Sequence, residues 1–218
     1  MEKINNYIEH TLLSPQASKD QIKKLIQEAI EYNFLGVCVN PNYVDFAKKL
    51  LEGKNTKVVT VVNFPLANNK IETVLYQTEH ALKDGADEID TVINLSELKN
   101  KNYKKVEDDI KKTKEICKDN NLKVIIETDV LTKEEIVIAS NCAVSGGANF
   151  VKTSTGFVKN GVGATVENVK LMYKTVSPHG LEVKASGGIK TYSQAIDLIN
   201  AGAVRLGTSS GVQIISGN

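Results

Sequence analysis

The chain has 218 residues, of which 41% are hydrophobic and 24% are charged, and these are the proportions of an ordinary globular protein. Its 27 basic and 26 acidic residues leave a formal net charge of +1. This balance gives no indication of a nucleic acid or an anionic membrane surface as a partner. Length alone favours neither one large domain nor two small ones, since closed α/β barrels commonly have about 200 to 250 residues.

The cysteines and the N-terminal segment indicate where the protein works. Cys38, Cys117 and Cys142 lie far apart and lack both the C-x-x-C spacing and a metal-ligand spacing. The segment "MEKINNYIEHTLL" has no apolar stretch of signal-peptide length, and no apolar run in the chain approaches the ~18 residues of a membrane span. These features predict a reduced, cytoplasmic protein without disulfides or a membrane partner.

Short β-rich runs recur along the whole chain and alternate with helical patterns. The runs occupy residues 7–11, 35–39, 57–62, 88–93, 122–127, 149–153, 181–184 and 203–206. Between most of them lie apolar residues at helical spacing, and this alternation indicates βαβ units and a parallel sheet. Because no linker interrupts the pattern, we predict an α/β fold, a single-domain (β/α)8 TIM barrel over residues 1–218. A doubly wound open sheet is the main alternative, but the glycine-rich turn that normally follows its first strand is absent.

Several charged strand residues are predicted to point into the barrel. Successive strand residues alternate between the lumen and the helix layer, and the apolar ones must face the helices. This alternation directs Asp90, Lys152, Glu182 and Lys184 inward, with both lysines expected at C-terminal strand ends, where barrel enzymes have their active sites. Taken singly, a strand lysine is more often solvent-exposed, and an aspartate at a strand end is more often a cap. The convergence of Asp90 and the two lysines on one lumen favours a site.

Two lysines and an aspartate in one pocket are suited to amine chemistry. A lysine amine is nucleophilic only when it is unprotonated, and a second cation in a partly dry pocket disfavours the ammonium form. One lysine could then attack a carbonyl carbon to form a Schiff base while the carboxylate relays protons. Such a set breaks or forms carbon–carbon bonds without a metal. No metal site is predicted, since His10, His80 and His179 are isolated.

Glycine-rich stretches follow the last two predicted strands. They are "ASGGIK" at 185–190 and "LGTSSG" at 206–211. Barrel enzymes frequently bind phosphate with the loops after strands seven and eight. Backbone N–H groups at these glycines, together with the hydroxyls of Thr208, Ser209 and Ser210, are suitable phosphate donors. Ordinary turn formation is the alternative, and neither stretch matches a P-loop.

Several of these motifs, taken in order, resemble one enzyme family. The motifs are "IEHTLL", "CVNPNYV", "GADEIDTVIN", "FVKTSTGF", "VKASGGIK" and "RLGTSSG". Together they resemble the deoxyribose-phosphate aldolases, class I aldolases with a TIM-barrel fold, from about residue 8 to about residue 213. The resemblance implies reversible cleavage of 2-deoxy-D-ribose 5-phosphate to D-glyceraldehyde 3-phosphate and acetaldehyde, in the catabolism of deoxyribonucleotides. It also implies a small phosphorylated sugar as substrate, no metal or organic cofactor, and an assembly that is commonly a homodimer.

The resemblance assigns a role to each central residue. It implies that Lys152 forms the Schiff base, that Lys184 assists this nucleophile and joins proton transfer, and that Asp90 belongs to the proton relay. The positions implied to bind phosphate are Gly187, Gly188, Gly207, Ser209 and Ser210. Two alternatives remain: a Schiff-base lyase or transaldolase-like enzyme for another phosphorylated sugar, and a non-catalytic sugar-phosphate-binding barrel. The intact motifs argue against the first, and the retained central residues argue against the second.

The chain departs from the family pattern at five positions. Glu9 replaces the usual aspartate, and its longer side chain is expected to reach further into the pocket. Asn63 and Ala67 stand where glycines are usual, Asp129 where a cysteine is more common, and Lys190 where arginine is usual. These departures are expected to affect substrate affinity and rate more than the reaction type.

Overall fold

The eight strands form a closed parallel barrel, which confirms the predicted TIM-barrel fold and excludes the open sheet. The structure is a computed structural model that describes residues 3–217. Each strand pairs in parallel with the next, and the last pairs with the first. The strands are β1 (Ile8–Leu12), β2 (Gly36–Val39), β3 (Lys57–Val62), β4 (Glu88–Val92), β5 (Asn121–Ile125), β6 (Phe150–Lys152), β7 (Glu182–Ser186) and β8 (Ala203–Thr208).

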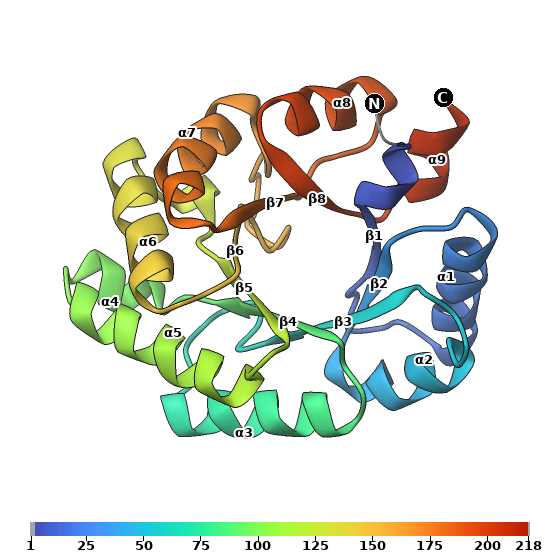
Figure 1. Cartoon of the computed structure of the whole chain (residues 1–218), viewed down its shortest axis with the longest axis horizontal. Helices are drawn as coiled ribbons and strands as arrows, with labels where there is room; N and C mark the ends of the chain where they lie inside the picture. The colour runs from blue at the N-terminus through green and yellow to red at the C-terminus, as the bar shows by residue number, and fades with distance from the viewer. Residues whose placement is uncertain (1–2, 218) are drawn as a thin grey trace.

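The helices form a ring around the barrel (Figure 1). They are α1 (Lys19–Glu31), α2 (Val44–Leu50), α3 (Ile71–Lys83), α4 (Leu95–Lys99), α5 (Tyr103–Cys117), α6 (Lys133–Ser145), α7 (Val166–Val176), α8 (Tyr192–Asn200) and α9 (Gly211–Ser216). Short 3-10 turns lie at Ile4–Tyr7, Pro41–Tyr43, Thr128–Val130 and Ser177–His179. The first of these turns contacts α9, so the two ends of the described chain lie side by side. No helix among residues 3–217 has the length and apolar character needed to cross a membrane.

Local sequence determines where several helices begin. Ser18, Thr132 and Thr191 are the N-cap residues of α1, α6 and α8, and each forms a capping box with the side chain three residues later. In a capping box two backbone N–H groups that the helix cannot satisfy find side-chain partners. Each cap therefore sets the residue at which a strand-to-helix connection ends. These connections lie at the C-terminal end of the barrel.

The core has two layers. The outer layer lies between strands and helices and contains the predicted helix-facing residues, such as Ile89, Val151 and Val183, all fully buried. Inside the barrel there are fewer apolar side chains, and they form two small clusters. One contains Cys38, Val59 and Val61 with Leu13, and the other contains Ala67, Val92 and Ile125. The three cysteines are buried free thiols. Charged side chains fill much of the remaining interior, and these form the candidate site.

Candidate active site

A pocket of about 430 Å³ opens at the C-terminal end of the barrel. The segments that follow β1, β6, β7 and β8 line it. Among the lining residues are Lys152 and all five positions predicted to bind phosphate, namely Gly187, Gly188, Gly207, Ser209 and Ser210. Lys190 also lines the pocket. The active sites of barrel enzymes lie at this end of the barrel. The residues that were predicted from the sequence to bind substrate therefore line a cavity at the expected end.

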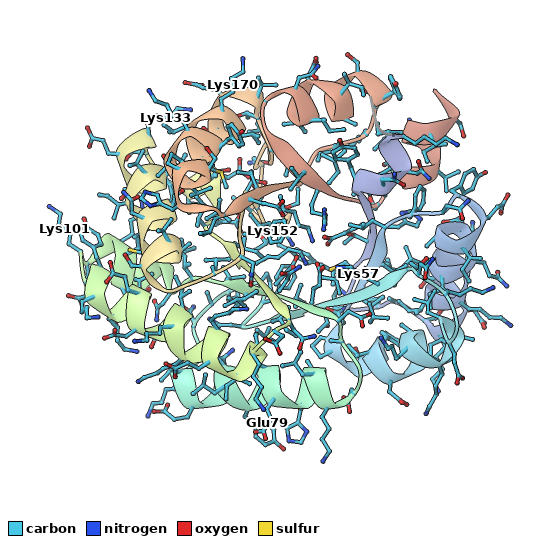
Figure 2. The ribbon with its side chains drawn as sticks, viewed as in Figure 1. Lys57, Glu79, Lys101, Lys133, Lys152 and Lys170 are labelled. Atoms are coloured by element: carbon cyan, nitrogen blue, oxygen red, sulfur yellow. The ribbon has the colours of Figure 1, made fainter. Side chains whose placement is uncertain are left out.

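Lys152, Asp90 and Lys184 contact one another beneath this pocket. Asp90 Oδ2 accepts hydrogen bonds from Lys152 Nζ at 2.8 Å and from Lys184 Nζ at 2.7 Å. Lys152 is the last residue of β6 and is 3% exposed, whereas Asp90 and Lys184 have no exposure at all. Figure 2 shows Lys152 inside the ring of strands, while Lys101, Lys133 and Lys170 extend from the periphery. Lys152 is therefore the central residue that a ligand in the pocket can contact, with Asp90 and Lys184 behind it.

Two details of the predicted placement are wrong. Lys184 is the middle residue of β7 rather than its C-terminal end, because the strand continues to Ser186 through pairing with β8. Glu182, also predicted to lie in the lumen, is exposed because it is the first residue of β7. Alternation along a strand predicts which face a side chain occupies, but not how far along the barrel it lies.

A third buried lysine, Lys123, was not among the predicted site residues. Lys123 of β5 is fully buried, and its Nζ lies 2.5 Å from Glu88 Oε2 and 3.1 Å from Asp90 Oδ1. Glu88 in turn pairs with Lys57, whose Nζ lies 2.5 Å from Glu88 Oε1. The same alternation that directed Lys152 inward applies to Lys123, since its neighbours Leu122 and Val124 face the helices. A continuous series of alternating charges thus runs through the barrel from Lys57 to the pocket.

Glu9 lies within this charge cluster and not in the pocket. Its carboxylate pairs with Lys184, lies 3.5 Å from Lys123 Nζ, and is completely buried. The longer side chain therefore reaches the second lysine beneath the pocket, which corrects the expectation that it would extend toward substrate. Glu9 Oε1 also lies 3.8 Å from Arg205 Nε of β8. Among residues 3–217 no group of three or more histidine, cysteine or carboxylate side chains is arranged to hold a metal ion.

The cluster shifts the pKa values of its members. Burial by itself raises the pKa of Asp90, but the ammonium groups of Lys123, Lys152 and Lys184 outweigh it and hold this pKa well below its usual range. Burial opposes the charged form of Lys184, yet the carboxylates of Asp90 and Glu9 raise its pKa above the ordinary value. Asp90 is consequently an anion and Lys184 a cation at neutral pH.

Burial and ion pairing also oppose each other at the end of the cluster that contains Glu88 and Lys123. Burial opposes ionisation of Glu88, but Lys123 and Lys57 lower the pKa of its carboxyl to about 2. Burial also opposes the charged form of Lys123, and Asp90 and Glu9 outweigh it and raise the pKa of this lysine. Buried charges are costly unless they are paired, and here each is paired with at least one opposite charge.

Two residues at the end of β8, Gly207 and Thr208, have structural roles near the predicted phosphate site. A side chain at Gly207 would come within 3.1 Å of Lys184 Cε and 3.0 Å of Ser186 Cβ. Glycine at this position therefore leaves room for the buried lysine. Thr208, which the sequence suggested as a hydroxyl donor to phosphate, donates instead to the carbonyl of Ile189 at 2.7 Å and accepts from Ser210 N at 2.9 Å. Its hydroxyl joins the two glycine-containing loops.

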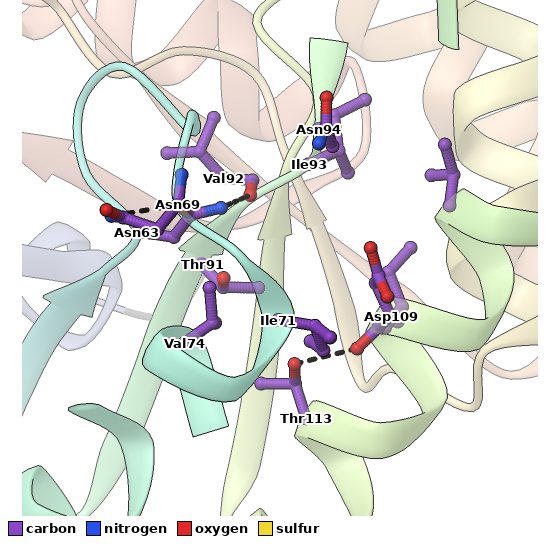
Figure 3. Close-up of a pocket in the computed structure, with 12 residues that line it drawn as sticks. Asn63, Asn69, Ile71, Val74, Thr91, Val92, Ile93, Asn94, Asp109 and Thr113 are labelled. Carbon is purple, nitrogen blue, oxygen red and sulfur yellow. Dashed lines mark hydrogen bonds between the residues drawn. The ribbon is translucent and has the colours of Figure 1, made fainter. Parts of the chain in front are cut away.

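The backbone conformation at Asn63 and Ala67 explains why glycine is usual at these two positions. Both residues adopt a positive φ, +54° and +57° respectively, a conformation that usually favours glycine. Asn63 lines a small second cavity with residues of β4, α3 and α5 (Figure 3). Its amide donates to the carbonyl of Val92 at 3.1 Å, and its Oδ1 accepts from Asn69. These hydrogen bonds attach the β3–α3 loop to β4 and compensate for the unfavourable backbone.

Comparison with known proteins adds an independent result. The family model described as "DeoC/LacD family aldolase" matches residues 7–217. The deoxyribose-phosphate aldolase of Streptococcus sanguinis is 50% identical over 99% of this chain and 96% of its own length. That of Macrococcus caseolyticus is 51% identical over 97% and 94%. Among solved structures, an aldolase called QR15 superimposes with a TM-score of 0.94 at 38% identity, over 99% of this chain and 96% of its own.

A more distant solved structure shares the same fold. The deoxyribose-phosphate aldolase of Aeropyrum pernix, described as having a unique tetrameric structure, superimposes with a TM-score of 0.88 at 31% identity. The alignment covers 98% of this chain and 89% of the other.

Proposed function

This chain belongs to the DeoC/LacD family of aldolases, and we propose that it reversibly cleaves 2-deoxy-D-ribose 5-phosphate to D-glyceraldehyde 3-phosphate and acetaldehyde through a Schiff base on Lys152. One observation carries the proposal: Lys152 lines the pocket, and its amine lies 2.8 Å from a fully buried carboxylate. Relatives about 50% identical over nearly their full length are deoxyribose-phosphate aldolases.

The chemistry begins with the Lys152 amine and the aldehyde carbon C1 of the open-chain sugar. After the Lys152 ammonium gives a proton to the Asp90 carboxylate, the lone pair of the resulting amine attacks C1, and transfer of a proton from nitrogen to oxygen completes the carbinolamine. Asp90 returns the proton as water leaves, and the product is an iminium ion. The iminium accepts the electron pair of the C2–C3 bond as that bond breaks, and the C3 hydroxyl gives its proton to the relay that ends at Asp90. Glyceraldehyde 3-phosphate leaves, the relay returns that proton to C2 of the enamine, and hydrolysis of the imine releases acetaldehyde and restores the amine.

Lys184 has a different role in this scheme. It contacts the same Asp90 oxygen as Lys152 and is held as a cation by Asp90 and Glu9. A fixed cation at this position stabilises the Asp90 carboxylate and supplies a proton donor to the relay. Because Lys184 has no exposure and does not line the pocket, its amine does not compete for the substrate carbonyl.

The phosphate is proposed to bind at the glycine-containing loops after β7 and β8. Gly187, Gly188, Gly207, Ser209 and Ser210 line the pocket, and we expect the backbone N–H groups of the glycines and the hydroxyls of the serines to donate to the phosphate. Lys190 at the pocket edge adds a positive charge near the phosphate. Binding energy from a phosphate remote from the reacting bond orients C1 toward Lys152.

Trapping tests the nucleophile directly. Incubation with acetaldehyde and sodium borohydride should convert the Schiff base to an ethylated lysine, which peptide mass spectrometry locates. We expect the adduct on Lys152 and its loss in Lys152→Ala. The exposed Lys170 on α7 provides a matched control, and Lys170→Ala should retain the adduct. An adduct distributed over surface lysines, or retained turnover of 2-deoxyribose 5-phosphate in Lys152→Ala, would refute the mechanism. Turnover should also survive treatment with a chelator.

We also propose that the protein works in the cytoplasm as a homodimer. The buried, unpaired thiols of Cys38, Cys117 and Cys142 support a reducing compartment. Analytical ultracentrifugation would distinguish a dimer from the tetramer described for the Aeropyrum pernix enzyme.

A further inference from the structure

The loop between β6 and α7, residues 153–165, forms one wall of the pocket but has no regular secondary structure (Figure 1). Thr155, Gly156 and Phe157 of this loop line the pocket. Such a segment needs partners for its backbone N–H groups. Two of its anchors come from the neighbouring β5–α6 connection, from the carboxylates of Glu127 and Asp129.

Glu127 attaches the beginning of the loop. Its carboxylate is buried and accepts hydrogen bonds from both the backbone N–H and the hydroxyl of Thr155. Glu127 itself has a positive φ of +59°, which is unfavourable for a residue with a side chain. This strained turn directs two carboxylates, Glu127 and Asp129, toward the same loop.

Asp129 attaches the far end of the loop. Its Oδ1 accepts from Val162 N at 2.9 Å, and its Oδ2 accepts from Gly163 N at 3.0 Å. The chain passes so close that a side chain at Gly161 would come within 2.8 Å of Asp129 Oδ2. A charged acceptor makes stronger hydrogen bonds than a neutral one, and the cysteine that is more common here would offer only a weak acceptor.

The segment that Asp129 holds packs directly on the predicted phosphate loop. Gly187 accepts a hydrogen bond at its carbonyl from Ala164 N at 3.1 Å. A side chain at Gly163 would lie 2.3 Å from Gly187 O, and one at Gly188 would lie 2.5 Å from Val162 O. The two loops therefore meet backbone to backbone, without side chains between them. A shift of Val162 or Gly163 must move Gly187 and Gly188.

From this arrangement we propose that Asp129 is a positioning residue for phosphate recognition. It does not line the pocket. It holds residues 162–163 in place, and these hold the backbone N–H groups of Gly187 and Gly188 at the positions that a substrate phosphate requires. The inference rests on the proposed function and goes beyond it, because it assigns selectivity for the phosphorylated sugar to a residue outside the pocket.

Steady-state kinetics with two substrates test the inference. For Asp129→Ala we expect KM for 2-deoxyribose 5-phosphate to rise about tenfold, which corresponds to ~1.4 kcal/mol, with kcat changed less than about twofold. The kcat/KM for unphosphorylated 2-deoxyribose should change less than about twofold, because that substrate makes no phosphate contacts. A purely structural defect would lower activity on both substrates. Equal losses on the two substrates, or no loss on either, would overturn the proposal.

A second variant and a control make the test specific. Asp129→Asn preserves the shape but turns one acceptor into an NH₂ donor that opposes a backbone N–H, so an intermediate rise in KM is expected. This variant carries the test if Asp129→Ala does not fold. Asp45→Ala removes an exposed carboxylate of α2, which pairs with Lys49 at the surface, and should behave as the unmodified protein.

Binding of inorganic phosphate separates this inference from the proposed function. Calorimetry should show weaker phosphate binding in Asp129→Ala than in the unmodified protein, whether or not the protein turns over the sugar. Borohydride trapping of acetaldehyde on Lys152 should be the same in both. Absence of trapping in the unmodified protein refutes the aldolase mechanism, whereas unchanged phosphate affinity in the variant refutes the role of Asp129.

Discussion

Asp90 is the carboxylate on which the buried charges of the barrel converge. Its Oδ2 contacts Lys152 and Lys184, and its Oδ1 lies 3.1 Å from Lys123 Nζ. The substitution Asp90→Asn keeps the shape of the side chain and removes its charge. No cavity opens, so the effect on stability comes from the lost charge and from the amide NH₂ that then faces a lysine ammonium.

The expected loss follows from the burial of the three lysines. Lys123 and Lys184 have no exposed surface and Lys152 is 3% exposed, so water cannot replace the missing carboxylate. Removal of one partner from a buried ion pair typically costs about 3–5 kcal/mol, because an uncompensated charge remains. A domain of this kind has a free energy of unfolding of about 5–15 kcal/mol. Asp90→Asn should therefore fold, but with much of its stability lost.

Urea unfolding measures this loss, and its pH dependence identifies the cause. Because the folded-state pKa of Asp90 lies well below its usual range, the carboxylate stabilises the protein above its unfolded-state pKa of about 3.9. That stabilisation disappears as the pH falls through the folded-state pKa. The free energies of unfolding of the two proteins should thus differ by about 3–5 kcal/mol at pH 7, and the difference should begin to shrink as the pH falls below about 4. Asp45→Asn, in which an exposed pair is lost, should cost less than about 1 kcal/mol. A difference below 1 kcal/mol at pH 7, or one that persists unchanged at pH 3, would refute this account.

Two further predictions concern residues outside the pocket. Lys123→Met removes a counter-charge that Asp90 and Glu88 share, so it should cost about 3–5 kcal/mol. Acid unfolding should begin at a higher pH than in the unmodified protein, because the pKa values of both carboxyls rise. An unchanged acid midpoint would contradict this. At position 63, Asn63→Ala and Asn63→Gly both lose the hydrogen bond to the Val92 carbonyl, but only alanine adds the cost of a positive φ, about 1–2 kcal/mol. Thermal unfolding should rank glycine above alanine, and the reverse order would show that backbone conformation is not the reason for the glycine preference.

Much of the site followed from the alternation of residues along each strand. Apolar neighbours had to face the helices, which directed Asp90 and Lys152 into the lumen, and the structure has them there. The same rule could have identified Lys123, since the strand "NLKVI" contains a lysine between two helix-facing residues. The loops after β7 and β8 could be located because every βα loop of a parallel barrel opens at the same end.

The sequence by itself determined the barrel, the faces of its strands and the residue types in its lumen, because hydrophobic periodicity is a local property of the chain. Only the tertiary structure decided which charges pair, since Glu9 and Lys184 are distant in sequence and meet through the closure of β1 on β8. It also decided the depth of each residue, which depends on register between strands. The contact of Asp129 with the β6–α7 loop is of the same kind: it depends on how two irregular loops pack, and no periodic pattern encodes that.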